Sequence, residues 1–232
     1  MCGRFVVASP PLLLAEHFDV DEVRLDGEGD PAPSPSYNVA PTDRVLAVAC
    51  GRDGRRLLGA FRWGLVPSWA SDPSGGARLI NARAETLADK PAFREAFARR
   101  RCLIPADGFY EWRLTTGGLK QPVFISPRAP GEVLAFAGLW EAWRGAGDAP
   151  PLRTCTIVTT SANDQLSSLH HRMPVVLARS AWPTWLDRSV VDAGELSSLL
   201  VPLPDGALTL RDVSRSVNDV RNKGPELLDA VP

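Results

Sequence analysis

Residues 101–114 read RCLIPADGFYEWRL, and this stretch indicates the fold class. It holds two β-like runs, Arg101–Ile104 and Phe109–Leu114, which are joined by a short polar segment. Side chains alternate between the two faces of a strand, so Glu111 shares a face with Phe109, opposite the two other aromatic side chains.

Similar β-like runs recur along most of the chain. They are Val45–Cys50, Leu57–Trp63, Val123–Ser126, Val133–Trp140 and Thr154–Thr160. The stretches GRDGR (51–55) and TTGG (115–118) join neighbouring runs as hairpin loops do. Short helices are predicted over Pro10–Phe18, Ala92–Arg101 and Glu195–Leu200, the first of them with Leu12, Leu13, Ala15 and Phe18 on one face.

Many short strands, few helices and no alternating strand–helix rhythm predict an α+β fold. Mostly antiparallel strands are expected to form a barrel-like core with a few peripheral helices. No linker-like stretch divides the chain, so residues 1–232 are interpreted as a single domain.

The composition is that of a globular protein, with 44% hydrophobic and 23% charged residues. No apolar run approaches the ~20 residues of a membrane helix, and charges follow the first apolar residues too soon for a secretory signal. A cytoplasmic protein with no membrane partner is therefore expected. The four cysteines contain no C-x-x-C pair, which argues against a zinc site and a disulfide framework.

The net charge is −1, so the protein does not show the overall basic character of a polyanion binder. Arginine nevertheless outnumbers lysine by 23 to 3. This bias is explained either by a GC-rich coding sequence or by a site that holds phosphate with guanidinium groups.

Cys2 lies one residue from the amino terminus, where chains are usually frayed and exposed. Cys50, Cys102 and Cys155 stand among apolar residues and are predicted to be buried. If Met1 is removed, Cys2 carries a thiol beside a free α-amine. Such an aminothiol can hydrolyse an amide as an N-terminal nucleophile, or condense with an aldehyde to a thiazolidine. The alternative is an inert cysteine in a disordered start.

Glu111 is either a solvated residue on the outer face of its strand or a carboxyl group in a partly apolar pocket. In the second case burial would raise its pKa and suit it to proton transfer. His170 and His171 precede Arg-Met-Pro in a polar segment. A histidine pair in a loop is commonly a surface feature, and without a third ligand nearby no metal site is predicted.

Three asparagines, Asn38, Asn81 and Asn163, stand where strands meet loops, and turn formation is the default explanation for each. Trp69 lies near arginines in the sequence, so it is either an ordinary rim aromatic or a platform on which a base stacks.

Six motifs occur in a fixed order along the chain. They are MCGRF (1–5), YNVAPT (37–42), RWGLVPSW (62–69), NARAET (81–86), GFYEW (108–112) and HHRMP (170–174). Together with VSRSVN (213–218) they resemble the SOS response-associated peptidase (SRAP) family over essentially the whole chain. Some members of that family carry a second aromatic residue after the PSW tryptophan, and Ala70 stands there in this chain.

The resemblance implies that the aminothiol attacks the ring-opened aldehyde of an abasic deoxyribose in single-stranded DNA. The product would be a thiazolidine DNA–protein crosslink that shields the lesion. The implied catalytic residues are Cys2 as the nucleophile, Asn38 positioning the sugar or amine, Glu111 as the proton shuttle and His170 at the 3′ phosphate. The implied DNA contacts are Arg4, Trp69, Asn81, Arg83, Thr159 or Thr160, and Arg172.

Two alternatives to this chemistry remain open. One is a cysteine-type peptidase, acting on itself or on other chains, that uses Cys2, Glu111 and His170. The other is a non-catalytic binder of single-stranded DNA. Aldehyde capture requires no metal and no nucleotide cofactor, and neither is expected. The expected partner is single-stranded DNA that contains abasic sites, bound by a monomer.

Overall fold

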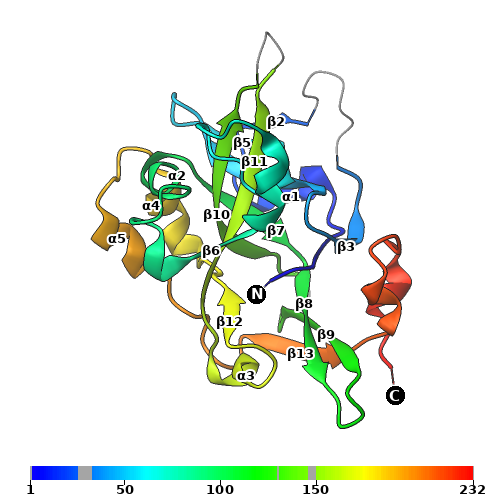
Figure 1. Cartoon of the computed structure of the whole chain (residues 1–232). Helices are drawn as coiled ribbons and strands as arrows, with labels where there is room; N and C mark the ends of the chain where they lie inside the picture. The colour runs from blue at the N-terminus through cyan, green and yellow to red at the C-terminus, as the bar shows by residue number, and fades with distance from the viewer. Residues whose placement is uncertain (1, 26–32, 130, 146–149, 232) are drawn as a thin grey trace.

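A five-stranded barrel forms the centre of the molecule (Figure 1). The computed structural model describes residues 2–25, 33–129, 131–145 and 150–231. The barrel order is β11–β10–β7–β4–β5, and a parallel pairing between β5 and β11 closes the ring. Its strands are β4 (Arg44–Cys50), β5 (Arg56–Trp63), β7 (Arg101–Ala106), β10 (Leu134–Trp143) and β11 (Leu152–Ser161). The predicted α+β fold with a barrel-like core is confirmed.

Three short strands extend this sheet. They are β2 (Glu22–Arg24), β6 (Asn81–Arg83) and β12 (Arg172–Pro174). Both β6 and β12 pair with β11, so Arg83 lies opposite Thr159 and Arg172 lies opposite Ser161. The motifs NARAET and HHRMP, which are far apart in the sequence, therefore meet at one end of β11.

A second, antiparallel sheet has the order β13–β9–β8–β1–β3. Its strands are β1 (Phe5–Val7), β3 (Ser36–Val39), β8 (Gly108–Leu114), β9 (Lys120–Pro127) and β13 (Leu208–Asp212). The RCLIPADGFYEWRL stretch passes from the barrel into this sheet at Asp107. The Asp107 carboxylate accepts hydrogen bonds from the backbone N–H groups of Ala8 and Ser9, at 2.6 and 3.0 Å, so it fixes the chain that follows β1.

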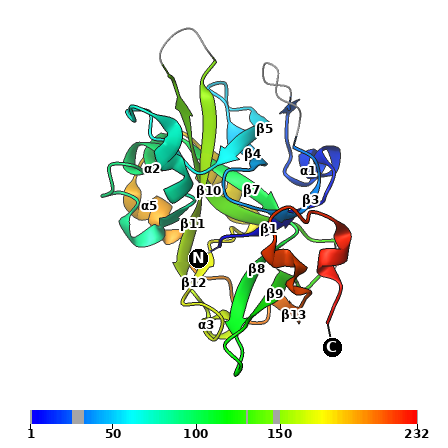
Figure 2. The same cartoon turned by 45° about the vertical axis from the view of Figure 1, so that its right-hand side comes forward.

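The amino-terminal strand closes one end of the barrel. Phe5 is completely buried, and its ring lies 5.0 Å from that of Trp63 and 6.1 Å from that of Phe136. The Phe109 ring, on β8, packs edge-on against Phe136 at 5.9 Å. Figure 2 shows the amino terminus between β8 and the β11–β12 side of the barrel. Cys2 and Phe5 are therefore anchored in the core, and the alternative of an inert Cys2 in a disordered start is wrong about its order.

The helices lie around the barrel, α2 and α5 on one side and α1 on another (Figures 1 and 2). They are α1 (Pro11–His17), α2 (Arg94–Arg99), α3 (Asp164–Ser167), α4 (Trp182–Leu186) and α5 (Ala193–Ser198), with 3₁₀ turns η1 (Pro73–Arg78), η2 (Ala84–Thr86), η3 (Arg179–Ala181), η4 (Arg215–Asn218) and η5 (Pro225–Leu228). None of the helices in the described ranges is long and apolar enough to cross a membrane.

Two details of the helix predictions are wrong. On α1 Leu14 is buried together with the predicted Phe18, while Leu12 and Leu13 are 78% and 48% exposed, so Leu14 takes the place of these two residues on the apolar face. Helix α2 is shorter than predicted because Arg101 already begins β7. The buried Arg101 guanidinium donates to the carbonyl groups of Phe97 and Ala98, and thereby satisfies the end of the helix.

Candidate active site

Cys2 is completely buried at the end of the barrel that β1 closes. Two contacts fix the backbone around it. The Asn81 side-chain amide donates to the Cys2 carbonyl at 2.8 Å, and Tyr110 N–H donates to the Arg4 carbonyl at 3.0 Å. Burial raises the pKa of the Cys2 thiol, and the negative charge of Glu111 raises it further. The thiol is therefore protonated at neutral pH and needs a base before it can react.

Glu111, on β8, is the base that the structure places near this thiol. Its strand pairs with β1 on one side and β9 on the other, where Val123 lies opposite Glu111. The side chain is buried. Glu111 is therefore a carboxyl group in a partly apolar pocket, and the alternative interpretation of a solvated residue on the outer face is wrong. Burial raises the pKa of the Glu111 carboxyl group to about 7, although the positive charge at the amino terminus acts in the opposite direction. A carboxyl group with this pKa both donates and accepts protons at neutral pH.

His170 follows the short helix α3, whose first turn is capped by Asn163. The backbone N–H of Arg172 donates to His170 Nδ1 at 2.9 Å, so the neutral ring carries its proton on Nε2. Burial lowers the pKa of His170, and the positive amino terminus lowers it further. The His171 ring stacks on it with 4.4 Å between centroids. His170 therefore acts as a neutral hydrogen-bond donor at neutral pH.

Asn38 does not have a side chain that can reach a substrate. It is completely buried, and its Nδ2 lies 3.1 Å from each of the carbonyl oxygens of Val217, Asp219 and Asn222. Its Oδ1 accepts a hydrogen bond from Arg4 at 3.0 Å. Every polar atom of the amide is thus used to fasten the C-terminal segment onto β3. The prediction that Asn38 positions the sugar or amine is corrected on this ground.

Asn81 is better placed than Asn38 to position the sugar or the Cys2 amine. Its Nδ2 holds the Cys2 carbonyl, whereas its Oδ1 is buried and has no hydrogen-bond partner among the described residues. Buried polar atoms without a partner are rare and often mark a ligand site. The sequence analysis placed Asn81 only among the DNA contacts. Its pairing with the far end of β11, which brings it to Cys2, could not be recognised from the sequence.

Thr159 and Arg172 support the site from within the protein. The Thr159 hydroxyl is buried and donates to the Ala82 carbonyl at 3.4 Å. Both Nη atoms of Arg172 bind the Glu85 carboxylate, at 2.6 and 2.9 Å, and Nη2 also donates to the Thr159 carbonyl at 2.6 Å. Arg172 thus joins η2 to β11, and the DNA contacts predicted for these two side chains stay predictions.

An open groove leads away from Cys2 along η1 and β6. Two cavities, of about 340 and 470 Å³, share Leu79 and Ala92. Trp69, which is 68% exposed, lines one cavity, and Asn81 and Arg83 line the other. Arg78 and Lys90 add two exposed positive charges to this groove. The sequence analysis missed both residues, because nothing in the sequence distinguishes them from other surface cations.

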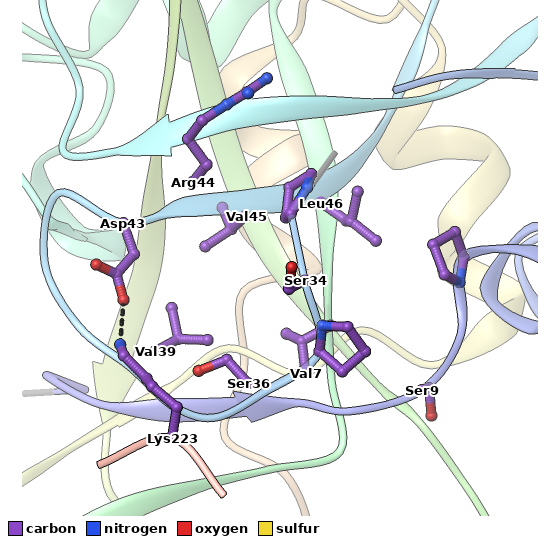
Figure 3. Close-up of a pocket in the computed structure, with 13 residues that line it drawn as sticks. Val7, Ser9, Ser34, Ser36, Val39, Asp43, Arg44, Val45, Leu46 and Lys223 are labelled. Atoms are coloured by element: carbon purple, nitrogen blue, oxygen red, sulfur yellow. Dashed lines mark hydrogen bonds and ion pairs between the residues drawn. The ribbon is translucent and has the colours of Figure 1, made fainter. Parts of the chain in front are cut away.

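Arg4 lies at the edge of the C-terminal segment rather than in this groove. Its Nη1 donates to the Val217 carbonyl at 2.8 Å, and its guanidinium lies 5.9 Å from the centre of the Trp112 ring. Figure 3 shows how Lys223 ties the same segment to Asp43, with 2.6 Å between Nζ and Oδ2. The adjoining cavity of about 540 Å³ is lined by none of the predicted site residues, so it lies apart from the candidate site.

Within the described ranges, no three His, Cys, Asp or Glu side chains lie close enough together to hold a metal ion. The contacts described above define the candidate site as Cys2, Asn81, Glu111 and His170, together with the groove along η1 and β6.

Solved structures share the fold that carries this site. A protein from Bacteroides thetaiotaomicron has a TM-score of 0.83 at 23% identity, covering 100% of both chains. A phage-related protein from Bordetella bronchiseptica has a TM-score of 0.68 at 30% identity, covering 92% of this chain and 95% of its own. The architecture is thus that of an established class of α+β barrel proteins.

Within that class the chain belongs to the SOS response associated peptidase (SRAP) family, whose model matches residues 1–220. Abasic site processing protein YoaM of Bacillus subtilis is 42% identical over 230 residues, which are 99% of this chain and 98% of YoaM. Abasic site processing protein YedK of Escherichia coli is 34% identical over 237 residues and 100% of both chains. Abasic site processing protein HMCES of Gallus gallus is 34% identical over 84% of this chain and 66% of HMCES. The resemblance inferred from the motifs is confirmed.

The contrast between Asn38 and Asn81 predicts different effects of the same substitution. Asn38→Ala removes the donor that three carbonyl groups share and the acceptor of Arg4, so the free energy of unfolding should fall by about 3 kcal/mol. Asn81→Ala removes one hydrogen bond and should cost about 1 kcal/mol. Urea unfolding of both variants measures this, and equal losses would contradict the assignment of Asn38 to structure and Asn81 to the site.

The raised pKa of Glu111 predicts how stability changes with pH. The carboxyl group in the unfolded chain ionises from about pH 4.5, while the folded one keeps its proton until about pH 7. The folded protein therefore binds more protons in this window, and its stability falls as the pH rises from about 4.5 to about 7. Glu111→Gln should remove this loss, gaining about 3 kcal/mol over wild type between pH 4.5 and pH 8.

The measurement is the free energy of unfolding of wild type and Glu111→Gln across that pH range. Glu95→Gln, which alters an exposed carboxylate on α2, is the matched control. A difference between wild type and Glu111→Gln that does not change with pH would show that Glu111 titrates normally.

Proposed function

We propose that this protein processes abasic sites in single-stranded DNA by forming a covalent thiazolidine crosslink through Cys2. The observation that supports this proposal most strongly is the placement of Asn81 and Glu111 beside the buried Cys2. An amide that fixes the Cys2 backbone and a carboxyl group with a pKa of about 7 lie beside a protonated thiol. The names of the relatives, abasic site processing proteins, support the same substrate.

The reaction begins after removal of Met1, which frees the Cys2 amine. The amine adds to the C1 aldehyde carbon of the ring-opened deoxyribose, and loss of water gives an iminium ion. The Cys2 sulfur then adds to the same carbon as the thiol gives up its proton, which closes the five-membered thiazolidine ring. One water leaves overall, and no electrons are gained or lost.

Glu111 is suited to both proton transfers. In its protonated form it donates a proton to the departing hydroxyl group, and the resulting carboxylate takes the proton of the thiol. His170 is neutral and donates from Nε2, which suits a sugar or phosphate oxygen of the lesion. The buried Asn81 Oδ1 accepts a hydrogen bond from the Cys2 amine or from a sugar hydroxyl group.

The groove along η1 and β6 offers single-stranded DNA a path to the Cys2 site. Trp69 offers an exposed ring on which a base stacks, and Arg78, Arg83 and Lys90 face the phosphates. The site lies at the end of a barrel, where a single strand reaches it without a duplex having to enter. A net charge of −1 is compatible with this role because the positive charge is local.

Peptide hydrolysis by the same residues is less well supported. A cysteine peptidase needs a thiol whose pKa is lowered, usually by an adjacent histidine. Here burial and the charge of Glu111 raise the pKa of the Cys2 thiol. In aldehyde capture the amine reacts first, and the thiol closes the ring only when Glu111 takes its proton.

The central experiment incubates the purified protein with a single-stranded oligonucleotide that holds one abasic site. A denaturing gel should show a shifted, heat-stable band for wild type and none for Cys2→Ala. Glu111→Gln should form the same band at least tenfold more slowly, because the proton shuttle is lost. Protein with an uncleaved N-terminal tag keeps the thiol but lacks the amine, and should form no band.

Crosslinking by Cys2→Ala at the wild-type rate would refute the proposal. Equal binding of undamaged and abasic strands with no adduct from any variant would instead favour a non-catalytic single-strand binder. Release of peptide fragments that depends on Cys2, without an adduct, would favour the peptidase.

The groove predicts how salt affects DNA binding. Each phosphate contact contributes about −0.7 to the slope of log affinity against log salt for single strands. The triple substitution Arg78→Ala, Arg83→Ala and Lys90→Ala should therefore reduce the slope by about 2. Fluorescence anisotropy in a Cys2→Ala background measures this without crosslinking. Arg128→Ala, an exposed arginine just after β9, is the control, and an equal effect in it would contradict the assigned path.

A further inference from the structure

The other end of the barrel holds a further cavity of about 230 Å³. Its walls are inward-facing barrel residues, among them Leu57, Gly59, Phe61 and Trp140. β11 begins at this mouth, near Arg153, and runs to Thr159 beside β6. Asn81, which holds Cys2, lies opposite Ile157, so about 13 Å of extended strand separate the barrel mouth from the Cys2 site. β2 and β5, whose residues help to line it, lie side by side in the upper part of Figure 1.

The barrel mouth has an aromatic wall with space beside it. The rings of Phe61 and Trp140 meet edge to face, with 5.9 Å between their centroids. Neighbouring inward positions carry Ala49 and Gly59 in place of larger residues. A Cβ atom at Gly59 would lie only 3.5 Å from the Phe61 ring, so a side chain there would occupy part of the free space. The cavity has the size and lining that suit one flat heterocycle.

Guanidinium groups surround this apolar cavity. They belong to Arg24, Arg52, Arg153 and Arg188. Arg24 is paired with Glu22, but within the described ranges the other three form no ion pair. The nearby carboxylates of Asp53 and Asp187 accept hydrogen bonds from Arg55 N–H and from Ser189, respectively. Three positive charges without a paired carboxylate among the described residues line one cavity, so an anion bound among them would be stabilised.

We propose that the barrel mouth binds a nucleotide unit, with the base against Phe61 and Trp140 and the phosphate on the arginine rim. A volume of about 230 Å³ admits the base but leaves the phosphate outside, where the guanidinium groups lie. Base–aromatic stacking and forked guanidinium–phosphate hydrogen bonds are the interactions that this pairing supplies. The nucleotide is either free or part of a DNA strand. The site does not depend on Cys2 and stands apart from the proposed crosslinking reaction.

Cys50, the last residue of β4, provides a reporter at the edge of this cavity. It is half-buried, whereas Cys102 and Cys155 are completely buried. In a Cys2→Ala background it is therefore the one thiol with exposed surface, and a thiol reagent should label it selectively. A ligand seated in the barrel mouth should slow that labelling.

The experiment measures binding of adenosine 5′-monophosphate, adenosine and inorganic phosphate by calorimetry, together with Cys50 labelling, in Cys2→Ala protein. The monophosphate should bind at least tenfold more tightly than either fragment and should protect Cys50. Arg153→Ala should weaken this binding at least tenfold, and the control Arg128→Ala should not change it. Crosslinking to abasic DNA by Arg153→Ala in the wild-type background should stay at the wild-type rate.

Labelling in the presence of an undamaged single strand distinguishes the two sources. Protection by the strand identifies a nucleotide within DNA, and protection by the monophosphate alone identifies a free nucleotide. The inference is overturned if neither protects Cys50, if phosphate alone binds as tightly as the monophosphate, or if Arg153→Ala binds as wild type does.

Discussion

The burial of Phe5 in the end of the barrel is the constraint on which the site depends. Its contacts with Trp63 and Phe136 hold β1 between β3 and β8, so the residues just before it cannot fray. Cys2 is thereby fixed against Asn81 and near Glu111. A reactive terminus on a flexible chain would lose the benefit of positioning, which is one of the larger contributions available to catalysis.

The same burial sets the protonation states of the site. It raises the pKa of both the Cys2 thiol and the Glu111 carboxyl group and lowers that of His170, so each group is neutral or close to its titration point at neutral pH. Neutral partners suit a reaction whose first step is attack by an amine and whose second step moves one proton from sulfur to carboxylate. The cost is stability at neutral pH, because ionised Glu111 is poorly solvated.

Much of the fold could be predicted from the sequence because alternation along a strand is a local property. The seven long strands and both hairpins follow from it, as does the placing of Glu111 with Phe109. The site was harder to predict because it depends on pairings between distant segments. Asn38 and Asn81 are equivalent by sequence, and only the pairing of β6 with β11 and the C-terminal contacts of Asn38 assign them different roles. The ion pair between Arg172 and Glu85 is hidden for the same reason.

Intact-mass measurement of the adduct, followed by mapping of the modified residue, shows whether Cys2 closes a thiazolidine ring on the abasic sugar. The proposed reaction predicts one species with the mass of the protein without Met1 plus the abasic oligonucleotide minus one water. The modification should lie on Cys2, with no free thiol there, and borohydride should leave it unchanged because the ring is already closed. An adduct on a lysine, or one that gains two hydrogens with borohydride, would contradict the account.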